Sequence, residues 1–125
     1  MEIIVLLKPD IVINNEIYQI KSEITKKLWT IEISKMIQLD ENFLKLFYAQ
    51  YVKEDFFQTN IVKNMITAPV IAMIVKTHSN ITDFNTITDI KKEIRKKFAK
   101  DKSNNSLHVS DSFESASYER ELLNW

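Results

Sequence analysis

A histidine near the end of the chain has the surroundings of a nucleophile. His108 closes a short apolar run, a hydroxyl follows two residues later at Ser110, and an acidic, helix-starting segment begins at Asp111. A neutral imidazole is a competent nucleophile at physiological pH, provided that a neighbour fixes which ring nitrogen carries the proton. A lone histidine is more often a partly buried residue satisfied by the backbone, so the rest of the chain must distinguish the two interpretations.

Two basic residues elsewhere in the chain suit the oxygens of a phosphate. Lys8 follows an apolar run directly, which would put its ammonium at the edge of a sheet. Arg95 is one of only two arginines, and a planar guanidinium matches phosphate oxygens better than an ammonium does. The simpler alternatives are a solvated lysine at a strand end and a surface arginine paired with Glu93 or Asp101. A nucleophile beside two cations would suit phosphoryl transfer.

Composition excludes several other kinds of site. The chain of 125 residues has no glycine, so Gly-rich phosphate loops of the Walker or Rossmann type are impossible. It has no cysteine, which excludes disulfides and thiolate nucleophiles. Side chains must therefore do most of any phosphate binding. Backbone positions that need a positive φ must be filled by Asn or Asp, or must carry strain.

Charge and hydropathy give expectations about partners. The formal net charge is zero, so no field of the whole molecule attracts nucleic acid. No apolar run approaches the roughly 18 to 20 residues of a membrane span, and Glu2 without a basic segment argues against a secretory signal. We expect a cytoplasmic protein that binds neither membrane nor nucleic acid. The basic run from Lys91 to Lys102 is interpreted as a solvated helix face.

The hydrophobic periodicity predicts strands and helices along a single domain, residues 1–125. Strands are expected at 3–7, 30–36, 69–75 and 106–109. Helices are expected at about 14–28, 41–50 and 56–65, after a cap at Thr82-Asp83, and from 112 to about 123, with Asp40 as a further N-cap. This order favours the α/β (α+β) class and a ferredoxin-like βαββαβ fold, an antiparallel four-stranded sheet covered by helices on one face.

Several separated segments together resemble the nucleoside diphosphate kinase family, from about Ile3 to Leu123. The specific matches are Lys8-Pro9-Asp10 after a strand, Ile94-Arg95 followed by Phe98, Asn105 three residues before His108, and Ser110-Asp111-Ser112 with Glu114, Ser115 and Ala116. The resemblance implies a Mg²⁺-dependent ping-pong reaction, in which the γ-phosphoryl of a nucleoside triphosphate passes to a nucleoside diphosphate through a phosphohistidine. The Mg²⁺ would be held through the nucleotide phosphates and not by protein ligands.

The resemblance also implies a role for each matched residue. His108 would be the nucleophile, oriented by Glu119 and Ser110, and Lys8, Arg95 and Tyr48 would stabilise the phosphoryl group. The nucleotide contacts would be Phe56 stacked on the base, Ile61 on the same wall, Asn105 at the sugar hydroxyl and Lys8 and Arg95 at the phosphates. Phe56 and Tyr48 could instead be core residues, and Asn105 a turn residue.

The sequence departs from the family between Val75 and Arg95. This segment is short and contains no arginine, where the family has a phosphate-contacting arginine and a threonine. Thr86 or Thr88 is the candidate for that threonine, with Thr88 as the expected nucleotide contact, and Lys91 or Lys92 is the candidate for the lost charge. The short loop and the end at Trp125 put the family's hexamer in doubt, whereas a dimer-based homo-oligomer is still expected.

Two alternatives stay open at this point. The chain could be a degenerate family member that binds a nucleotide or a protein without useful turnover, which the missing arginine favours. It could also be an unrelated ferredoxin-like domain that binds nucleic acid through Lys91 to Lys102, in which case replacing His108 would change nothing.

Overall fold

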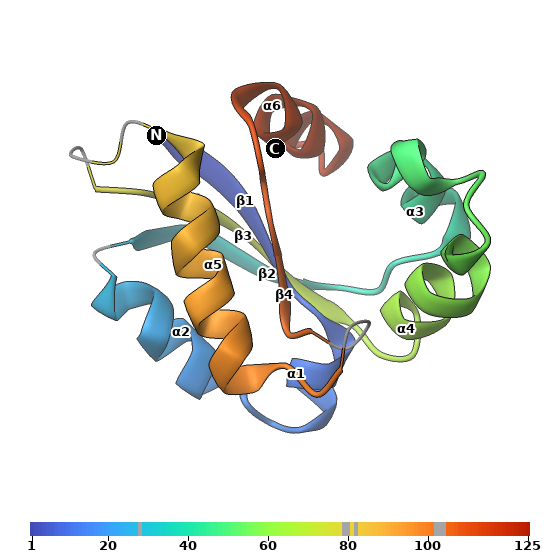
Figure 1. Cartoon of the computed structure of the whole chain (residues 1–125), viewed down its shortest axis with the longest axis horizontal. Helices are drawn as coiled ribbons and strands as arrows, with labels where there is room; N and C mark the ends of the chain where they lie inside the picture. Colours follow the sequence, from blue (N-terminus) through green and yellow to red (C-terminus); the bar gives the residue numbers. More distant parts are fainter. Residues whose placement is uncertain (28, 79–80, 82, 102–104) are drawn as a thin grey trace.

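A four-stranded antiparallel sheet forms the centre of the molecule in the computed structural model, which describes all residues except 28, 79–80, 82 and 102–104 (Figure 1). Its strands lie in the order β2-β3-β1-β4. Their bounds are β1 Glu2–Leu7, β2 Thr30–Ile37, β3 Val70–Lys76 and β4 Leu107–Val109. The predicted ferredoxin-like sheet is confirmed, and each predicted strand is present to within one or two residues.

The helices alternate with these strands along the chain. They are α1 Pro9–Ile13, α2 Ile17–Lys26, α3 Glu41–Phe47, α4 Lys63–Met65, α5 Phe84–Phe98 and α6 Phe113–Leu122, with a 3₁₀ turn η1 at Ala49–Tyr51 and a π-helical segment η2 at Phe57–Val62. No helix within the described residues is long and apolar enough to span a membrane.

Side-chain N-caps explain where three helices begin, and two of these caps, Asp40 and Asp83, were predicted. The side chain of Asp40 accepts a hydrogen bond from the Phe43 amide at 2.8 Å, and Ser112 accepts one from the Ser115 amide at 3.0 Å. Asp83 caps α5 in the same way, whereas its predicted companion Thr82 lies outside the described residues. Each cap satisfies an amide that the first turn of a helix leaves without a partner.

The predicted helix from residue 14 to 28 was wrong at its start. Proline suits the first position of a helix, and Pro9 begins the short helix α1 directly after β1. Asn15 then takes a φ of 56°, which ends α1, and α2 begins at Ile17. The predicted end at residue 28 lies outside the described residues. The predicted helix at 41–50 also breaks, because α3 stops at Phe47 and the 3₁₀ turn η1 follows. The predicted helix at 56–65 is confirmed as one helical segment, in which the π-helical η2 runs directly into α4.

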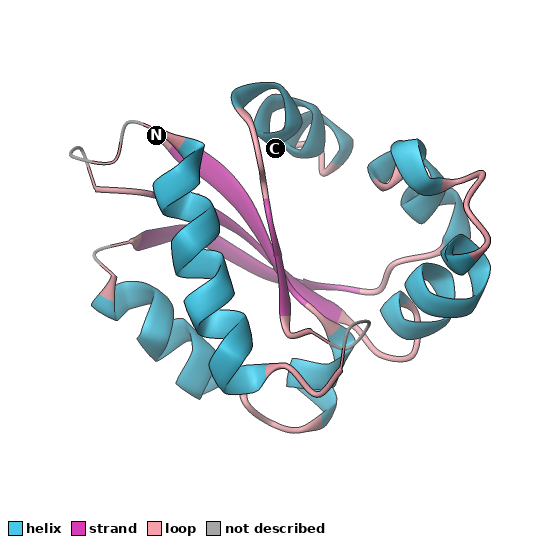
Figure 2. Ribbon diagram, in the orientation of Figure 1, coloured by secondary structure: helices cyan, strands magenta, loops and turns pink. Residues whose placement is uncertain are grey.

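Helices cover both faces of the sheet, and the expectation that they cover one face was wrong (Figure 2). Side chains of β1 alternate between two cores: Ile3, Val5 and Leu7 pack with α2 and α5, and Ile4 and Leu6 pack with α3, η2 and α4. Because both faces are buried, β1 is apolar from Ile3 to Leu7 and not alternately polar. The strand ends abruptly at a charge, which is why Lys8 stands at the rim of the sheet.

The pairing of β1 with β4 carries the histidine to that same rim. His108 lies opposite Leu6 in the antiparallel register. The Lys8 amide donates to the Ser106 carbonyl at 2.8 Å, which ties the end of β1 to the start of β4. Ser106, just before β4, has a φ of 76°. Glycine would take this φ without strain, but the sequence has no glycine, so the backbone is strained here.

Candidate active site

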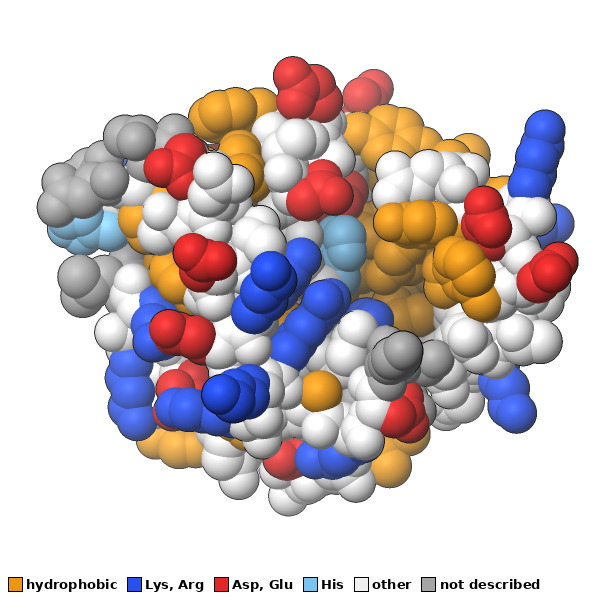
Figure 3. Space-filling model, in the orientation of Figure 1, with side chains coloured by type: hydrophobic (Ala, Val, Ile, Leu, Met, Phe, Trp, Pro, Cys, Tyr) orange, Lys and Arg blue, Asp and Glu red, His pale blue; other side chains and the backbone are white. Residues whose placement is uncertain are grey.

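A cavity of about 450 Å³ opens where the end of β1, the strand β4 and the helices α5 and α6 face α3, η1 and η2. Figure 3 shows a histidine near the middle of this face, with Lys and Arg side chains on one side of it and hydrophobic side chains on the other. The lining residues explain this division, because the cations come from β1 and α5 and the aromatic rings come from α3, η1 and the segment before η2.

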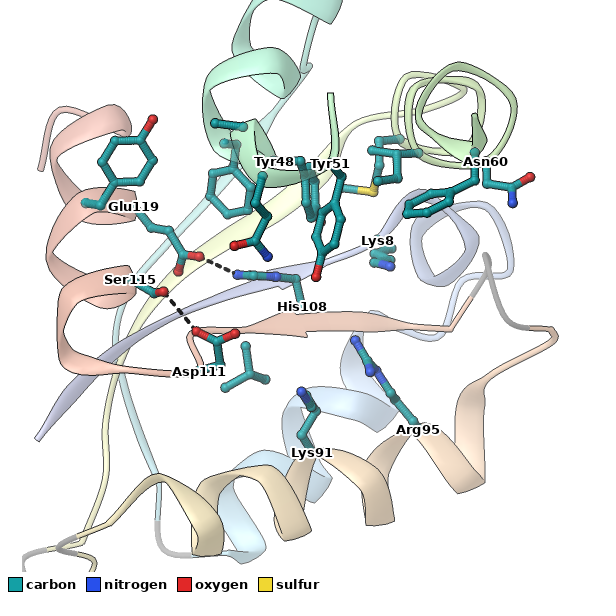
Figure 4. Close-up of a pocket in the computed structure, with 18 residues that line it drawn as sticks. Lys8, Tyr48, Tyr51, Asn60, Lys91, Arg95, His108, Asp111, Ser115 and Glu119 are labelled. Carbon is teal, nitrogen blue, oxygen red and sulfur yellow. Dashed lines mark hydrogen bonds and ion pairs between the residues drawn. The ribbon is translucent and has the colours of Figure 1, made fainter. Parts of the chain in front are cut away.

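His108 is held at one ring nitrogen by a buried carboxylate (Figure 4). Its Nε2 lies 2.8 Å from Oε2 of Glu119, and Ser110 Oγ donates to the other oxygen, Oε1, at 2.6 Å. Ser110 Oγ in turn accepts from the Ile4 amide at 2.9 Å, so β1 fixes this chain of contacts. A carboxylate accepts and does not donate, so Nε2 carries the proton and Nδ1 keeps its lone pair.

Aromatic rings restrict the position of this imidazole. The ring centroid of Phe47 lies 4.9 Å from that of His108, and the Tyr48 centroid lies 5.9 Å away, both in edge-on arrangements. Burial, and then the Glu119 carboxylate, raise the pKa of the Tyr48 phenol well above its ordinary range. The phenol therefore keeps its proton and is a hydrogen-bond donor beside the histidine.

Two of the predicted cations line the cavity close to His108. Lys8 Nζ donates to Asn105 Oδ1 at 2.6 Å, and Arg95 donates from Nε and Nη2 to the Leu107 carbonyl at 3.2 and 2.8 Å. The bonds to Leu107 join α5 to the strand that carries the histidine. Burial, together with repulsion from the Arg95 guanidinium, lowers the pKa of Lys8 to about 8. An anion in the cavity would relieve this unfavourable burial of positive charge.

The opposite wall is aromatic and apolar. Of the adjacent pair, Phe56 lines the cavity and is 39% exposed, whereas Phe57 is 1% exposed and belongs to the core. The Tyr51 ring lies 5.7 Å from that of Phe56, and Ile61 continues the wall from η2. A flat ring exposed in a cavity is a surface on which any nucleobase could stack.

The structure thus brings together most of the residues singled out from the sequence. His108, Glu119, Lys8, Tyr48, Phe56, Ile61 and Arg95 all line the cavity, and Ser110 lies behind Glu119. Asn105 does not line it but is bonded to Lys8. Thr88 is not brought to it: this half-buried residue lies on α5, one turn before the part of the helix that reaches the cavity.

Other lining residues were missed or left undecided by the sequence. Of the two candidate lysines, Lys91 lines the cavity, whereas Lys92 is exposed and does not. Tyr51, Asn60 and Tyr118 were given no role, and nothing in their spacing marks them, because they meet only in three dimensions. The helical period of α5 could have favoured Lys91, since residues four apart share one face with Arg95.

The described residues contain no group of three or more His, Asp or Glu side chains that could hold a metal ion. Glu119 is bonded to both His108 and Ser110. Asp111 is the other carboxylate of the lining, and Ser115 Oγ donates to its Oδ1 at 2.8 Å, whereas its Oδ2 has no hydrogen bond to a described residue. A divalent cation bound here would need most of its ligands from a bound phosphate chain, as is common for Mg²⁺.

Fold and site together define a ferredoxin-like α+β protein with a carboxylate-held histidine in a cation-lined cavity. The family model for nucleoside diphosphate kinase matches residues 2–124. The chain therefore belongs to the nucleoside diphosphate kinase family.

Individual relatives and structures agree with this assignment. Nucleoside diphosphate kinases of Wolbachia sp. subsp. Brugia malayi and Histophilus somni are 37% and 31% identical, over 89% and 91% of this chain and 84% and 85% of theirs. The crystal structure of the Aquifex aeolicus nucleoside diphosphate kinase has a TM-score of 0.80 and 25% identity, over 98% of this chain and 93% of that one. A Halobacterium salinarum nucleoside diphosphate kinase in complex with CDP has the same fold, with a TM-score of 0.81 and 21% identity, over 98% of this chain and 86% of that one.

Proposed function

We propose that this protein is an active nucleoside diphosphate kinase that transfers the γ-phosphoryl group of a nucleoside triphosphate to a nucleoside diphosphate. The observation that supports this most directly is the contact of 2.8 Å between His108 Nε2 and Glu119 Oε2, which leaves Nδ1 unprotonated in a cavity lined by cations. The nucleoside diphosphate kinases of Histophilus somni and Wolbachia, to which this chain is similar, support the same reaction.

In the first half-reaction Nδ1 of His108 attacks the γ-phosphorus. The nitrogen–phosphorus bond forms as the bond from that phosphorus to the oxygen bridging the β- and γ-phosphates breaks, and the nucleoside diphosphate leaves with the electron pair. The imidazole then carries the phosphoryl on Nδ1 and the proton on Nε2, and the Glu119 carboxylate stabilises the positive charge that this ring acquires. A second nucleoside diphosphate takes the phosphoryl group by the reverse of these steps.

The charge that spreads over the transferring group is met by the cavity's donors. Lys8 and Arg95 would contact the phosphate oxygens, and Tyr48, which keeps its proton, would donate a hydrogen bond. When bound, Mg²⁺ would neutralise part of the charge on the β- and γ-phosphates. Asp111 is the lining carboxylate that has one oxygen without a hydrogen bond to a described residue, and it could give the Mg²⁺ one ligand. The nucleotide would supply most of the other ligands.

Nucleotide recognition would rely on stacking. Phe56 offers an exposed ring at the cavity, with Ile61 beside it. Asn105, which is bonded to Lys8, would contact the sugar hydroxyl of a nucleotide whose phosphates reach Lys8. Stacking distinguishes poorly among bases, so this wall suits several nucleoside diphosphates.

A homodimer is supported by the outer edge strand β2, where Met36 is 60% exposed.

Steady-state kinetics with two nucleotides tests this proposal. A ping-pong enzyme gives parallel lines in double-reciprocal plots when the triphosphate is varied at several fixed concentrations of a different diphosphate. We expect parallel lines, activity that requires Mg²⁺, and use of more than one base. Nucleotide binding without any exchange of phosphoryl groups would instead assign the chain to the degenerate, binding-only alternative.

A further inference from the structure

The cavity contains a cation that the reaction above does not use. Lys91 lies on α5 one helical turn before Arg95, and both residues line the cavity. Figure 4 shows the two side chains extending from the same helix toward β4, the strand of His108. Lys92 follows Lys91 in sequence but is exposed outside the lining, as the 100° step between successive helical residues requires.

Lys91 differs from Arg95 and Lys97 on α5 because its charged group makes no bond to another described residue. Within the described part of the chain it has neither a hydrogen bond nor an ion pair. Lys97, at the surface end of the same helix, is paired with Glu23 at 2.9 Å. Arg95 uses two of its nitrogens on the Leu107 carbonyl. Of the two α5 cations that line the cavity, Lys91 is therefore the one whose charged group is not already bonded within the described residues.

Its position is unfavourable while the cavity holds no anion. Burial and the Arg95 guanidinium both lower the pKa of Lys91, and the Asp111 carboxylate opposes them only in part. A half-buried lysine beside a half-buried arginine destabilises the ligand-free protein through repulsion and desolvation. A bound polyanion would attract both positive charges and so offset the repulsion between them and their desolvation. Such clusters of charge are common in binding sites for this reason.

We propose that Lys91 contacts the phosphates of the bound nucleotide, so that α5 supplies two phosphate-binding cations, Lys91 and Arg95, one turn apart. The proposal rests on the function proposed above. The segment between Val75 and Arg95 contains no arginine, and α5 runs unbroken from Phe84 to Phe98. A continuous helix with cations four residues apart therefore provides the positive charge at this place in the chain.

The test compares Lys91→Met with Lys92→Met, which removes the same charge from the adjacent, outward-facing position. The first readout is the rate at which His108 is phosphorylated by ATP and Mg²⁺ in a single turnover. We expect Lys91→Met to slow this step roughly 10- to 100-fold. Lys92→Met should stay within about twofold of the native chain, as a solvated charge contributes little. Lys91→Arg should restore most of the lost rate. Equal rates for the two methionine variants would overturn the proposal.

A second readout separates this proposal from the proposed function. Binding of ADP and of inorganic tripolyphosphate is measured for the native chain and both methionine variants. Weaker binding of both ligands by Lys91→Met alone supports the phosphate contact, even if the native chain forms no phosphohistidine and the kinase proposal fails. Unchanged binding by Lys91→Met, relative to Lys92→Met, overturns it whatever the native chain's activity. Melting temperatures measured alongside exclude unfolding as the cause.

Discussion

Glu119 Oε2 lies 2.8 Å from Nε2 of His108, and its other oxygen accepts from Ser110 Oγ at 2.6 Å. With both oxygens engaged, the carboxylate cannot rotate without breaking a buried hydrogen bond. The imidazole therefore presents Nδ1, and not Nε2, to the cavity. This relationship fixes both the tautomer of the histidine and the atom at which a phosphoryl group would be carried.

Replacing Glu119 tests this arrangement. In Glu119→Gln the amide can either accept from Nε2–H or donate to Nε2, and the second rotamer stabilises the wrong tautomer, while the negative charge is lost in both. We expect His108 phosphorylation to slow roughly 10- to 100-fold with little loss of nucleotide affinity. Rapid-quench measurement of the phosphoenzyme checks the rate, and a variant that phosphorylates at the native rate would contradict the assignment.

Replacing Ser110 distinguishes an effect on stability from an effect on the phosphorylation of His108. Ser110 Oγ accepts from the Ile4 amide at 2.9 Å in a buried position, so Ser110→Ala leaves that amide without an acceptor. We expect a loss of about 1–3 kcal/mol in the free energy of unfolding, measured by urea denaturation. The phosphorylation rate should fall less than in Glu119→Gln, because the carboxylate itself remains. A larger kinetic effect than that of Glu119→Gln would argue against the proposed order of importance.

The lowered pKa of Lys8 predicts a pH dependence of nucleotide binding. In the ligand-free protein Lys8 titrates at about 8, and bound phosphates raise that pKa, so binding takes up a proton above pH 8. Affinity for ADP should be level below that pH and fall roughly tenfold between pH 7 and pH 9. Calorimetry in buffers of different ionisation enthalpy measures the proton uptake. Lys8→Met should bind ADP weakly, and its affinity should depend less on pH. If the pH dependence of this variant equalled that of the native chain, the assignment to Lys8 would be wrong.

The same residue should reduce the stability of the empty protein. Lys8 binds its proton less tightly in the folded chain than in the unfolded chain, whose lysines keep their ordinary pKa of 10.5. The unfavourable contribution is thus fully present below pH 8 and disappears as pH rises toward the unfolded value. At pH 7 we expect Lys8→Met to raise the free energy of unfolding by roughly 1–3 kcal/mol. A less stable Lys8→Met variant would mean that the contact with Asn105 outweighs the desolvation.

Phe56 and Phe57 form a matched pair for the base wall. Phe56→Ala removes an exposed ring and should weaken ADP binding by about 1–3 kcal/mol with almost no change in stability. Phe57→Ala empties a core position and should cost about 3–5 kcal/mol of stability. Inorganic tripolyphosphate, which has no base, should bind equally to native protein and Phe56→Ala. If it bound more weakly to Phe56→Ala, base stacking would not be the role of this ring.

Much of this could be predicted from the sequence because the signals are local. Strand β1 contains the unbroken apolar run Ile3 to Leu7, and Asp40 and Asp83 are predicted caps that precede helices. The histidine, its two orienting residues and the cations Lys8 and Arg95 occur at positions that resemble one family.

What could not be predicted depends on tertiary contacts. Helix α1 follows from Pro9, but the apolar periodicity of the next segment hid the break at Asn15. The choice between Lys91 and Lys92 depends on which face of α5 packs against β4. The helical period puts Lys91 on the face of Arg95, but that this face meets β4 is a tertiary contact. That helices cover both faces of the sheet could not be predicted, because it depends on the packing of the segment around Phe57 against β1.

The central claim is that His108 carries a phosphoryl group, and intact-protein mass spectrometry tests it most directly. The protein is mixed with ATP and Mg²⁺, with or without EDTA, beside His108→Ala and His78→Ala, which removes the chain's other histidine. We predict the added mass of one phosphoryl group on native protein and on His78→Ala. The added mass should be absent with EDTA or in His108→Ala, and it should be lost when a nucleoside diphosphate is added. Absence of the adduct from native protein, or its persistence in His108→Ala, would contradict the account.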